Sequence, residues 1–116
     1  MAIIVVEDLL FRAKIQAAAG LAGAQLQTPP GADEALALLR ATPGALLIID
    51  LNHSRFDPVQ LIRAIREAAV PARVVGFCSH VDTGLAAQAR EAGCDVVLPR
   101  SAFVKQLPEL LQGSPA

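Results

Sequence analysis

The sequence predicts an α/β fold in which helices cover both faces of a five-stranded parallel sheet. Short apolar segments alternate with segments of helical periodicity along the whole chain, at a spacing of about 22 residues. The strongest strand-like segments are continuously apolar, as expected when both faces of a strand are buried. The repeated segments share no side-chain signature beyond strand then helix, which argues against a solenoid.

Composition bounds the class of protein. The chain has 116 residues, 53% of them hydrophobic and 18% charged, which suits one domain over residues 1–112 followed by a disordered tail at 113–116. Mean hydropathy is +0.47, yet no apolar run approaches the roughly 20 residues of a membrane-spanning helix. No export signal opens the sequence, so we expect a cytoplasmic protein without membrane contact.

Charge and aromatic content argue against direct nucleic-acid binding. The formal net charge is -1, and the chain has four Phe but no Trp or Tyr. Nucleic-acid binders use a basic surface to neutralise phosphates and aromatic rings to stack on bases. This sequence has neither a basic run nor enough rings.

The first two strand and helix pairs are of unequal clarity. Ile3 to Val6 predicts a buried strand, and a helical pattern follows from Asp8 to about Leu21, ended by Gly20 and Gly23. Ala24 to Gln27 alternates weakly, as an edge strand does. After a Pro-Pro-Gly turn, Asp33 to Ala41 predicts the second helix.

The third and fourth pairs are stronger. Ala45 to Ile49 predicts a central strand that ends at Asp50. Asp57 and Pro58 suit the cap and first turn of a helix that runs to about Ala69. Arg73 to Cys78 predicts the fourth strand, and Asp82 to Ala92 the fourth helix.

The last pair contains an irregularity. Asp95 to Pro99 predicts the fifth strand, and Ser101 can cap a helix over Ala102 to Gln112. Pro108 lies seven residues after Ser101 and lacks a backbone donor. We therefore expect either a kink or two short helical pieces.

Polar side chains follow the predicted strands at their carboxyl ends. They are Glu7 and Asp8 after the first strand, Asp50 after the third, Ser79 and His80 after the fourth, and Arg100 after the fifth. In a sheet of order 2-1-3-4-5 the first and third strands are neighbours, so the three carboxylates should converge at the edge where such folds bind ligands. A strand that merely meets water often ends in the same residue types, so only the combination is informative.

Converging carboxylates predict a site for Mg²⁺ and a phosphoryl group. Oxygen ligands in this number suit Mg²⁺, which neutralises their repulsion and attracts phosphoryl oxygens. Asp50 is then the best-placed nucleophile. Ser79 could donate a hydrogen bond to the phosphoryl group, and Arg100 could pair with it through two hydrogen bonds.

These motifs resemble the receiver domain of two-component response regulators, a flavodoxin-like (βα)5 fold, over nearly the whole chain. The similar segments are residues 3–8 with their acidic pair, residues 47–52 around the phosphoacceptor strand, residues 74–80, and residues 92–100 with their leading Ala-Gly. The resemblance implies that Glu7, Asp8 and Asp50 bind Mg²⁺ together with the backbone carbonyl of Asn52. It also implies that Asp50 accepts phosphate and that Ser79 is the switch hydroxyl.

The sequence departs from this family at positions that matter for switching. Arg100 and Ser101 stand where the family has Lys and Pro, and a planar guanidinium does not replace a compact ammonium conservatively. Val97 stands where the family has an aromatic switch residue. His53 and Ser54 replace the usual Met-Pro after the phosphoacceptor. We expect an atypical receiver.

Three functions therefore compete. The first is a phospho-accepting signalling domain whose only chemistry is self-phosphorylation and self-dephosphorylation. The second is a pseudo-receiver, a protein interaction module that signals without phosphate, as the changes at Arg100 and Val97 suggest. A metal-dependent phosphatase or other hydrolase using Asp50 is the third and rests on the fold alone.

The expected partners are proteins. The family resemblance implies contact with a histidine kinase or downstream effector through the fourth helix, fifth strand and fifth helix. Here that surface is flat and apolar, because Val97 and an Ala-rich helix form it, so a homodimer is a further hypothesis. Cys78 and Cys94 should be reduced thiols at opposite ends of neighbouring strands. His53 and His80 lack the spacing of a transition-metal site.

Overall fold

The computed structural model describes residues 1–79 and 83–112 and contains five strands and five helices within them. The strands are β1 (Ala2–Val5), β2 (Leu26–Gln27), β3 (Ala45–Asp50), β4 (Ala72–Cys78) and β5 (Val96–Pro99). The helices are α1 (Leu9–Ala22), α2 (Ala32–Ala41), α3 (Pro58–Glu67), α4 (Thr83–Ala92) and α5 (Arg100–Leu111). All strand pairs are parallel and the order is β2-β1-β3-β4-β5, as the sequence predicts.

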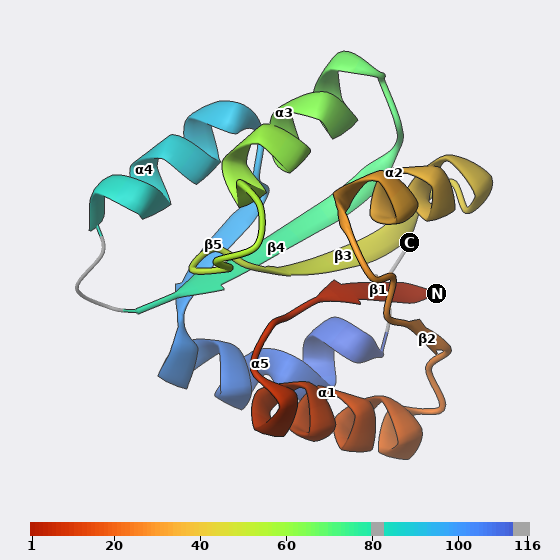
Figure 1. Ribbon diagram of the computed structural model, residues 1–116. Coiled ribbons are helices and arrows are strands. Elements are labelled where there is room, and N and C mark those ends of the chain that lie inside the picture. The colour runs from red at the N-terminus through yellow and green to blue at the C-terminus, as the bar shows by residue number, and fades with distance from the viewer. Residues whose placement is uncertain (80–82, 113–116) are drawn as a thin grey trace.

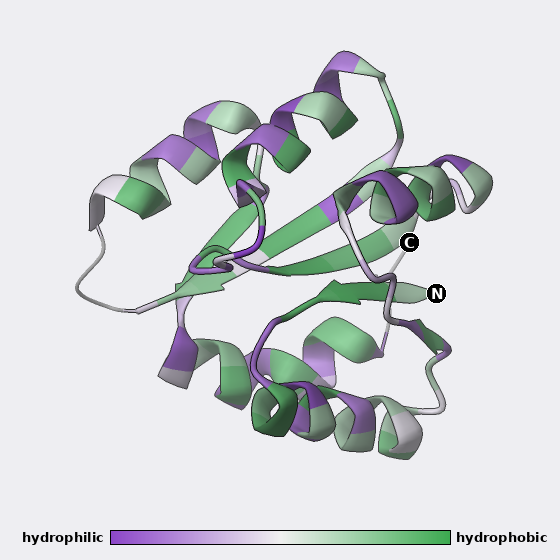
Figure 2. Cartoon of the chain, in the orientation of Figure 1, coloured by the Kyte–Doolittle hydropathy of each residue, from purple (hydrophilic) through white to green (hydrophobic). Residues whose placement is uncertain are grey.

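Three layers surround this sheet. Helices α1 and α5 cover one face, and α2, α3 and α4 cover the other (Figure 1). Hydrophobic colouring fills the central strands, while the helices are hydrophilic on parts that face away from the sheet (Figure 2). Alternate residues of β3 belong to opposite cores, with Ile49 packed under α2 and α3 and Ile48 under α1 and α5. The sheet therefore separates two apolar cores.

Strand β2 is only two residues long because of its sequence. Leu26 and Gln27 pair with Ala2 and Ile3 of β1, and the chain then leaves the sheet at Thr28. Pro29 and Pro30 follow immediately and have no backbone N–H to donate to a neighbouring strand. The carboxyl end of β1 therefore has no partner strand on that side.

Helix α1 is longer than its glycines suggest. It passes through Gly20 and ends at Ala22, where Gly23 adopts a left-handed conformation with φ 69°. A left-handed residue after the last helical turn lets backbone N–H groups bond the free carbonyls, and glycine adopts it without strain. The true end signal is Gly23. Helix α3, by contrast, ends at Glu67, two residues earlier than predicted.

Helix α5 corrects the prediction of two helical pieces, since it is continuous from Arg100 to Leu111 with Pro108 inside it. Pro108 is on the exposed side, so only one solvent-facing hydrogen bond is missing. Leu107, Leu110 and Leu111 are buried on the other side and fasten the last turn to the core. The expected start of α4 at Asp82 lies outside the described residues.

Candidate functional site

Asp50 ends the central strand β3 and is the one buried charged side chain among the described residues, at 3% exposure. Its Oδ1 accepts a hydrogen bond from the backbone N–H of Asn52 at 2.9 Å. Burial raises the pKa of Asp50, while the amide of Asn52 and the charge of Arg100 act in the opposite direction. Burying a carboxylate in an apolar site is costly in free energy, so Asp50 lowers the stability of the fold unless it is neutralised.

Glu7 is held by a loop that follows β3. Its Oε1 accepts a hydrogen bond from the backbone N–H of Ser54 at 3.0 Å, and the Ser54 hydroxyl donates to Oε2. These two bonds lower the pKa of Glu7. The carboxylate is therefore kept ionised and turned toward the β3–α3 loop.

Asp8 serves as the N-cap of α1. Its Oδ1 accepts from the backbone N–H groups of Leu10 at 2.9 Å and Phe11 at 3.1 Å. Its Oδ2 lies 3.9 Å from Nη1 of Arg100, and both side chains are about half exposed. Such an exposed ion pair contributes little stability, so the cap is the firmer role of Asp8 in this conformation.

The donor set suits Mg²⁺ chemically but is not gathered into a ligand cage here. In residues 1–79 and 83–112, no three His, Cys, Asp or Glu side chains are grouped so as to hold a metal ion. The predicted convergence of Glu7, Asp8 and Asp50 is thus incomplete, because Ser54 holds the first and the α1 cap holds the second. All three are hard oxygen donors, and the two outer ones are accessible enough to turn.

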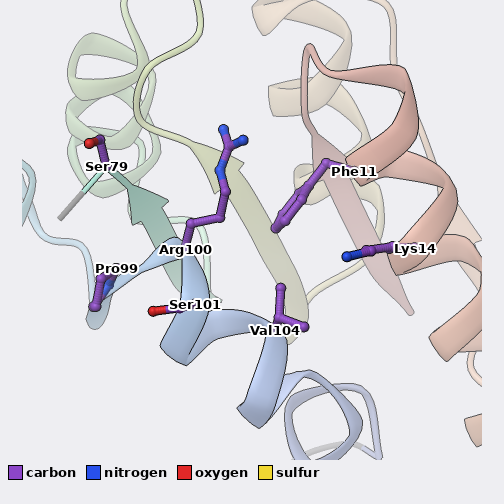
Figure 3. A pocket seen from close by; sticks show the side chains of 7 residues that line it. All are labelled: Phe11, Lys14, Ser79, Pro99, Arg100, Ser101 and Val104. Atoms are coloured by element: carbon purple, nitrogen blue, oxygen red, sulfur yellow. The ribbon is translucent and has the colours of Figure 1, made fainter.

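Arg100 lies over aromatic rings. Its guanidinium carbon is 4.9 Å from the ring centre of Phe11 and 5.7 Å from that of Phe77. Figure 3 shows the side chain extending from the start of α5 beside Phe11, along one wall of a cavity of about 710 Å³. No hydrogen bond or ion pair joins Arg100 to Asp50 in the described part of the chain. Cation–π contact therefore positions this arginine.

Asn52 and Ser79 link the ends of β3 and β4. The backbone N–H of Ser79 donates to Oδ1 of Asn52 at 3.0 Å. The family resemblance implies a role only for the backbone carbonyl of Asn52, and this contact gives its side chain a further, positioning role. Ser79 is exposed and lies beside Arg100 on the wall of the same cavity.

The remaining polar candidates are the two cysteines and the two histidines. Of these, His53 lies near enough to Asp50 and Glu7 to act electrostatically on both. Cys78 and Cys94 are both buried, and no disulfide joins them. His53 packs against Phe56, with ring centres 4.4 Å apart. His80, its suggested companion in a metal site, lies outside the described residues.

Solved structures with the same architecture identify the fold. The structure titled FixJ-N matches with a TM-score of 0.80 at 18% identity, covering 96% of this chain and 91% of its own. The receiver domain of the putative response regulator NarL from Mycobacterium tuberculosis matches at 0.79 and 20%, with 95% and 90% covered. The chain has the receiver-domain fold.

A third receiver domain of interest is phosphorylated. This cyanobacterial phytochrome response regulator, RcpA, matches with a TM-score of 0.67 at 22% identity, covering 96% of this chain and 88% of its own. No protein-family model matches the sequence, and no curated protein is similar to it. No helix of the described receiver fold has the length and apolarity to cross a membrane.

Ser54 is the functional candidate that sequence reasoning missed. It directly engages Glu7, 47 residues away in sequence. In the sequence Ser54 stands out only because it and His53 replace the family's Met-Pro after the predicted Asp50 strand, which indicates proximity to the site but not the contact with Glu7. Its contact depends on the path of the β3–α3 loop, which local propensity does not fix.

Replacing the buried carboxylate should stabilise this receiver fold. We expect Asp50→Asn to raise the free energy of unfolding at pH 7 by about 1–2 kcal/mol, because it removes a buried charge at similar volume. Burial raises the pKa of Asp50 in the folded state. The folded wild type therefore becomes less stable as pH rises from the unfolded pKa of this carboxyl to its folded pKa, because the buried group loses its proton over that interval. The advantage of Asn should therefore be largest above that interval.

Urea denaturation at several pH values measures this effect. The gap between Asp50→Asn and wild type should shrink as pH falls toward the ordinary Asp pKa of about 3.9. Asp33→Asn, at an exposed position of α2, is the matched control and should change little. A destabilised Asp50→Asn at pH 7 would show that the charge is compensated rather than costly.

Proposed function

We propose that residues 1–112 form a signalling domain that accepts a phosphoryl group on Asp50 with Mg²⁺ and passes this state to a protein partner. The observation that supports it best is the buried Asp50 at the end of the central strand. A carboxylate there destabilises the fold, and no ion pair within 4.0 Å in the described residues offsets the cost. A costly carboxylate at the edge of the sheet where ligands bind favours a chemical role for Asp50.

The proposed step is nucleophilic. An oxygen of Asp50 forms a bond to phosphorus as the bond from phosphorus to the donor's leaving group breaks, and the leaving group keeps the electron pair. Arg100 contributes positive charge to this edge, since it already acts electrostatically on Asp50. The Ser79 hydroxyl is the group that would bind the transferred phosphoryl.

Magnesium fits this proposal through Glu7, Asp8, Asp50 and the Asn52 carbonyl. When bound, the ion neutralises charge on the carboxylates and on the phosphoryl oxygens. Glu7 accepts two hydrogen bonds from Ser54, and the remaining lone pairs of its carboxylate would be available to the ion.

The proposed output surface is the face formed by α4, β5 and α5. Val97 is half-buried there and lines a cavity of about 200 Å³ together with Ala86 and Leu98. Ser79, Thr83 and Arg90 also line this cavity, so the surface is indented and only partly apolar. A histidine kinase, a downstream effector in the cytoplasm or a second copy of the chain could bind it, and sedimentation at increasing concentration tests the last of these.

Intact-mass spectrometry after incubation with acetyl phosphate and Mg²⁺ tests phosphorylation. We expect the mass of one phosphoryl group to be added to wild type and to Asp33→Asn, and none to Asp50→Asn. Omission of Mg²⁺ should suppress the reaction. An unmodified wild type, or equal modification of Asp50→Asn, would overturn the proposal.

A pseudo-receiver is the second candidate, and the placement of Arg100 supports it. The guanidinium lies over the rings of Phe11 and Phe77 and is not bonded to Asp50. This position of Arg100 is stabilised by packing on the rings and does not depend on a phosphoryl group at Asp50. Mg²⁺ titration separates the candidates. Saturable millimolar binding that Asp50→Asn weakens favours phosphochemistry, and its absence together with partner binding by Asp50→Asn favours the pseudo-receiver.

A further inference from the structure

A second cavity, of about 470 Å³, lies where β2 leaves the sheet. Its floor is residues 4–6 at the carboxyl end of β1, which β2 does not cover because pairing stops at Gln27. One wall is Thr28, Pro29 and Pro30. The cavity is therefore a direct result of the two-residue β2.

Two arginines, Arg12 and Arg55, line this cavity. Neither Arg12 nor Arg55 forms an ion pair within 4.0 Å in the described residues. Arg12 is fixed by two hydrogen bonds to the carbonyl of Val6, from Nε at 3.3 Å and from Nη2 at 2.7 Å. Its Nη1 makes no hydrogen bond to the described residues.

The other ionisable groups of the cavity leave its charge positive. Glu7 is the single acidic residue on its walls, and both oxygens of that carboxylate already accept hydrogen bonds from Ser54. His53 also lines the cavity, and its Nδ1 accepts from the backbone N–H of Arg55 at 3.2 Å. An anion entering here would meet two guanidinium groups, one of which, that of Arg55, also attracts the Glu7 carboxylate.

We propose that this cavity binds a small molecule carrying a phosphate group. A phosphate offers several acceptor oxygens and up to about two charges, enough for two guanidinium groups at once. The volume lies within the roughly 300–1,000 Å³ of small-molecule sites, so it accepts a body beyond the phosphate. Leu9, Pro29 and Pro30 provide apolar contact for that body. Asp50 does not line the cavity, although Glu7 borders both this cavity and the proposed phosphorylation site.

Titration of the ¹⁵N-labelled chain with phenyl phosphate, followed by nuclear magnetic resonance, tests the site. We expect saturable shifts at Arg12, Thr28 and Arg55, weaker binding of inorganic phosphate, and none of phenol. Arg55→Gln should weaken binding at least about tenfold, because it removes a charge-assisted hydrogen bond. Arg63→Gln, at an exposed position of α3 outside the cavity, should leave binding unchanged.

Two further variants keep the test decisive. Arg12→Gln should also weaken binding, and its melting curve controls for the lost bonds to Val6. Asp50→Asn should bind phenyl phosphate as wild type does, which separates this site from the proposed phosphoacceptor. Absence of binding at about 10 mM, or equal weakening by Arg63→Gln and Arg55→Gln, would overturn the proposal. Equal affinity for inorganic phosphate and phenyl phosphate would overturn the role of the apolar wall.

Discussion

Phe77→Ala is expected to lower the free energy of unfolding by about 3–5 kcal/mol, a large part of the stability of a domain of this size. The Phe77 ring is fully buried on β4. It stacks on Phe103 of α5 with ring centres 4.7 Å apart and contacts Phe11 of α1 at 4.8 Å. Truncation would leave a cavity between sheet and helices that neither ring can fill without leaving its own partner.

Urea denaturation of Phe77→Ala measures this loss, and Phe77→Leu is its control. Leucine keeps most of the apolar volume, so Phe77→Leu should cost less than about half as much. The same ring lies under Arg100, so both variants should also alter the signals of that side chain. A loss below about 1 kcal/mol for Phe77→Ala would mean that the α1–α5 side of the core is loosely packed.

The sheet topology is the part of this fold that the sequence predicts best. Continuously apolar strands such as Ala45 to Ile49 can only be buried on both faces, and the intervening helices force parallel pairing. Helix ends were less certain, since Gly20 and Pro108 are ordinary end signals that tertiary packing overrides here. Buried leucines on α5 outweigh one missing hydrogen bond.

The sequence predicts where the residues of the candidate site lie in the sheet, but not which groups their side chains contact. Asp50, Glu7 and Asp8 do lie at the carboxyl edge of neighbouring strands. Which groups they touch depends on loop paths and rotamers, and these bring Ser54 to Glu7 and place Arg100 over Phe11. The cavity lined by Arg12 and Arg55 could not be predicted either, because these residues are 43 positions apart and the β2–α2 turn creates the space between them.

Gly93→Ala is expected to be the second severe substitution, with a loss of about 2–4 kcal/mol. Gly93 adopts φ 115°, where an L-residue is strained, and a Cβ there would lie 2.5 Å from Cγ of Arg66. Arg66 cannot easily move aside. Its guanidinium donates to the carbonyls of Gly93 and Ala72 at 3.0 Å each and to Asp95 at 2.8 Å, joining α3 to the first residue of β4 and to the loop before β5.

Two comparisons isolate the cause of that loss. Gly20→Ala makes the same chemical change within α1, where an added Cβ meets no atom within 4 Å, so it should stabilise by about 0.5–1 kcal/mol. In an Arg66→Ala background the clash is absent, and Gly93→Ala should then cost only its backbone strain, about 1–2 kcal/mol. Additive losses in this double-mutant cycle would contradict a steric coupling between Gly93 and Arg66 and would assign the whole cost to the backbone conformation of Gly93.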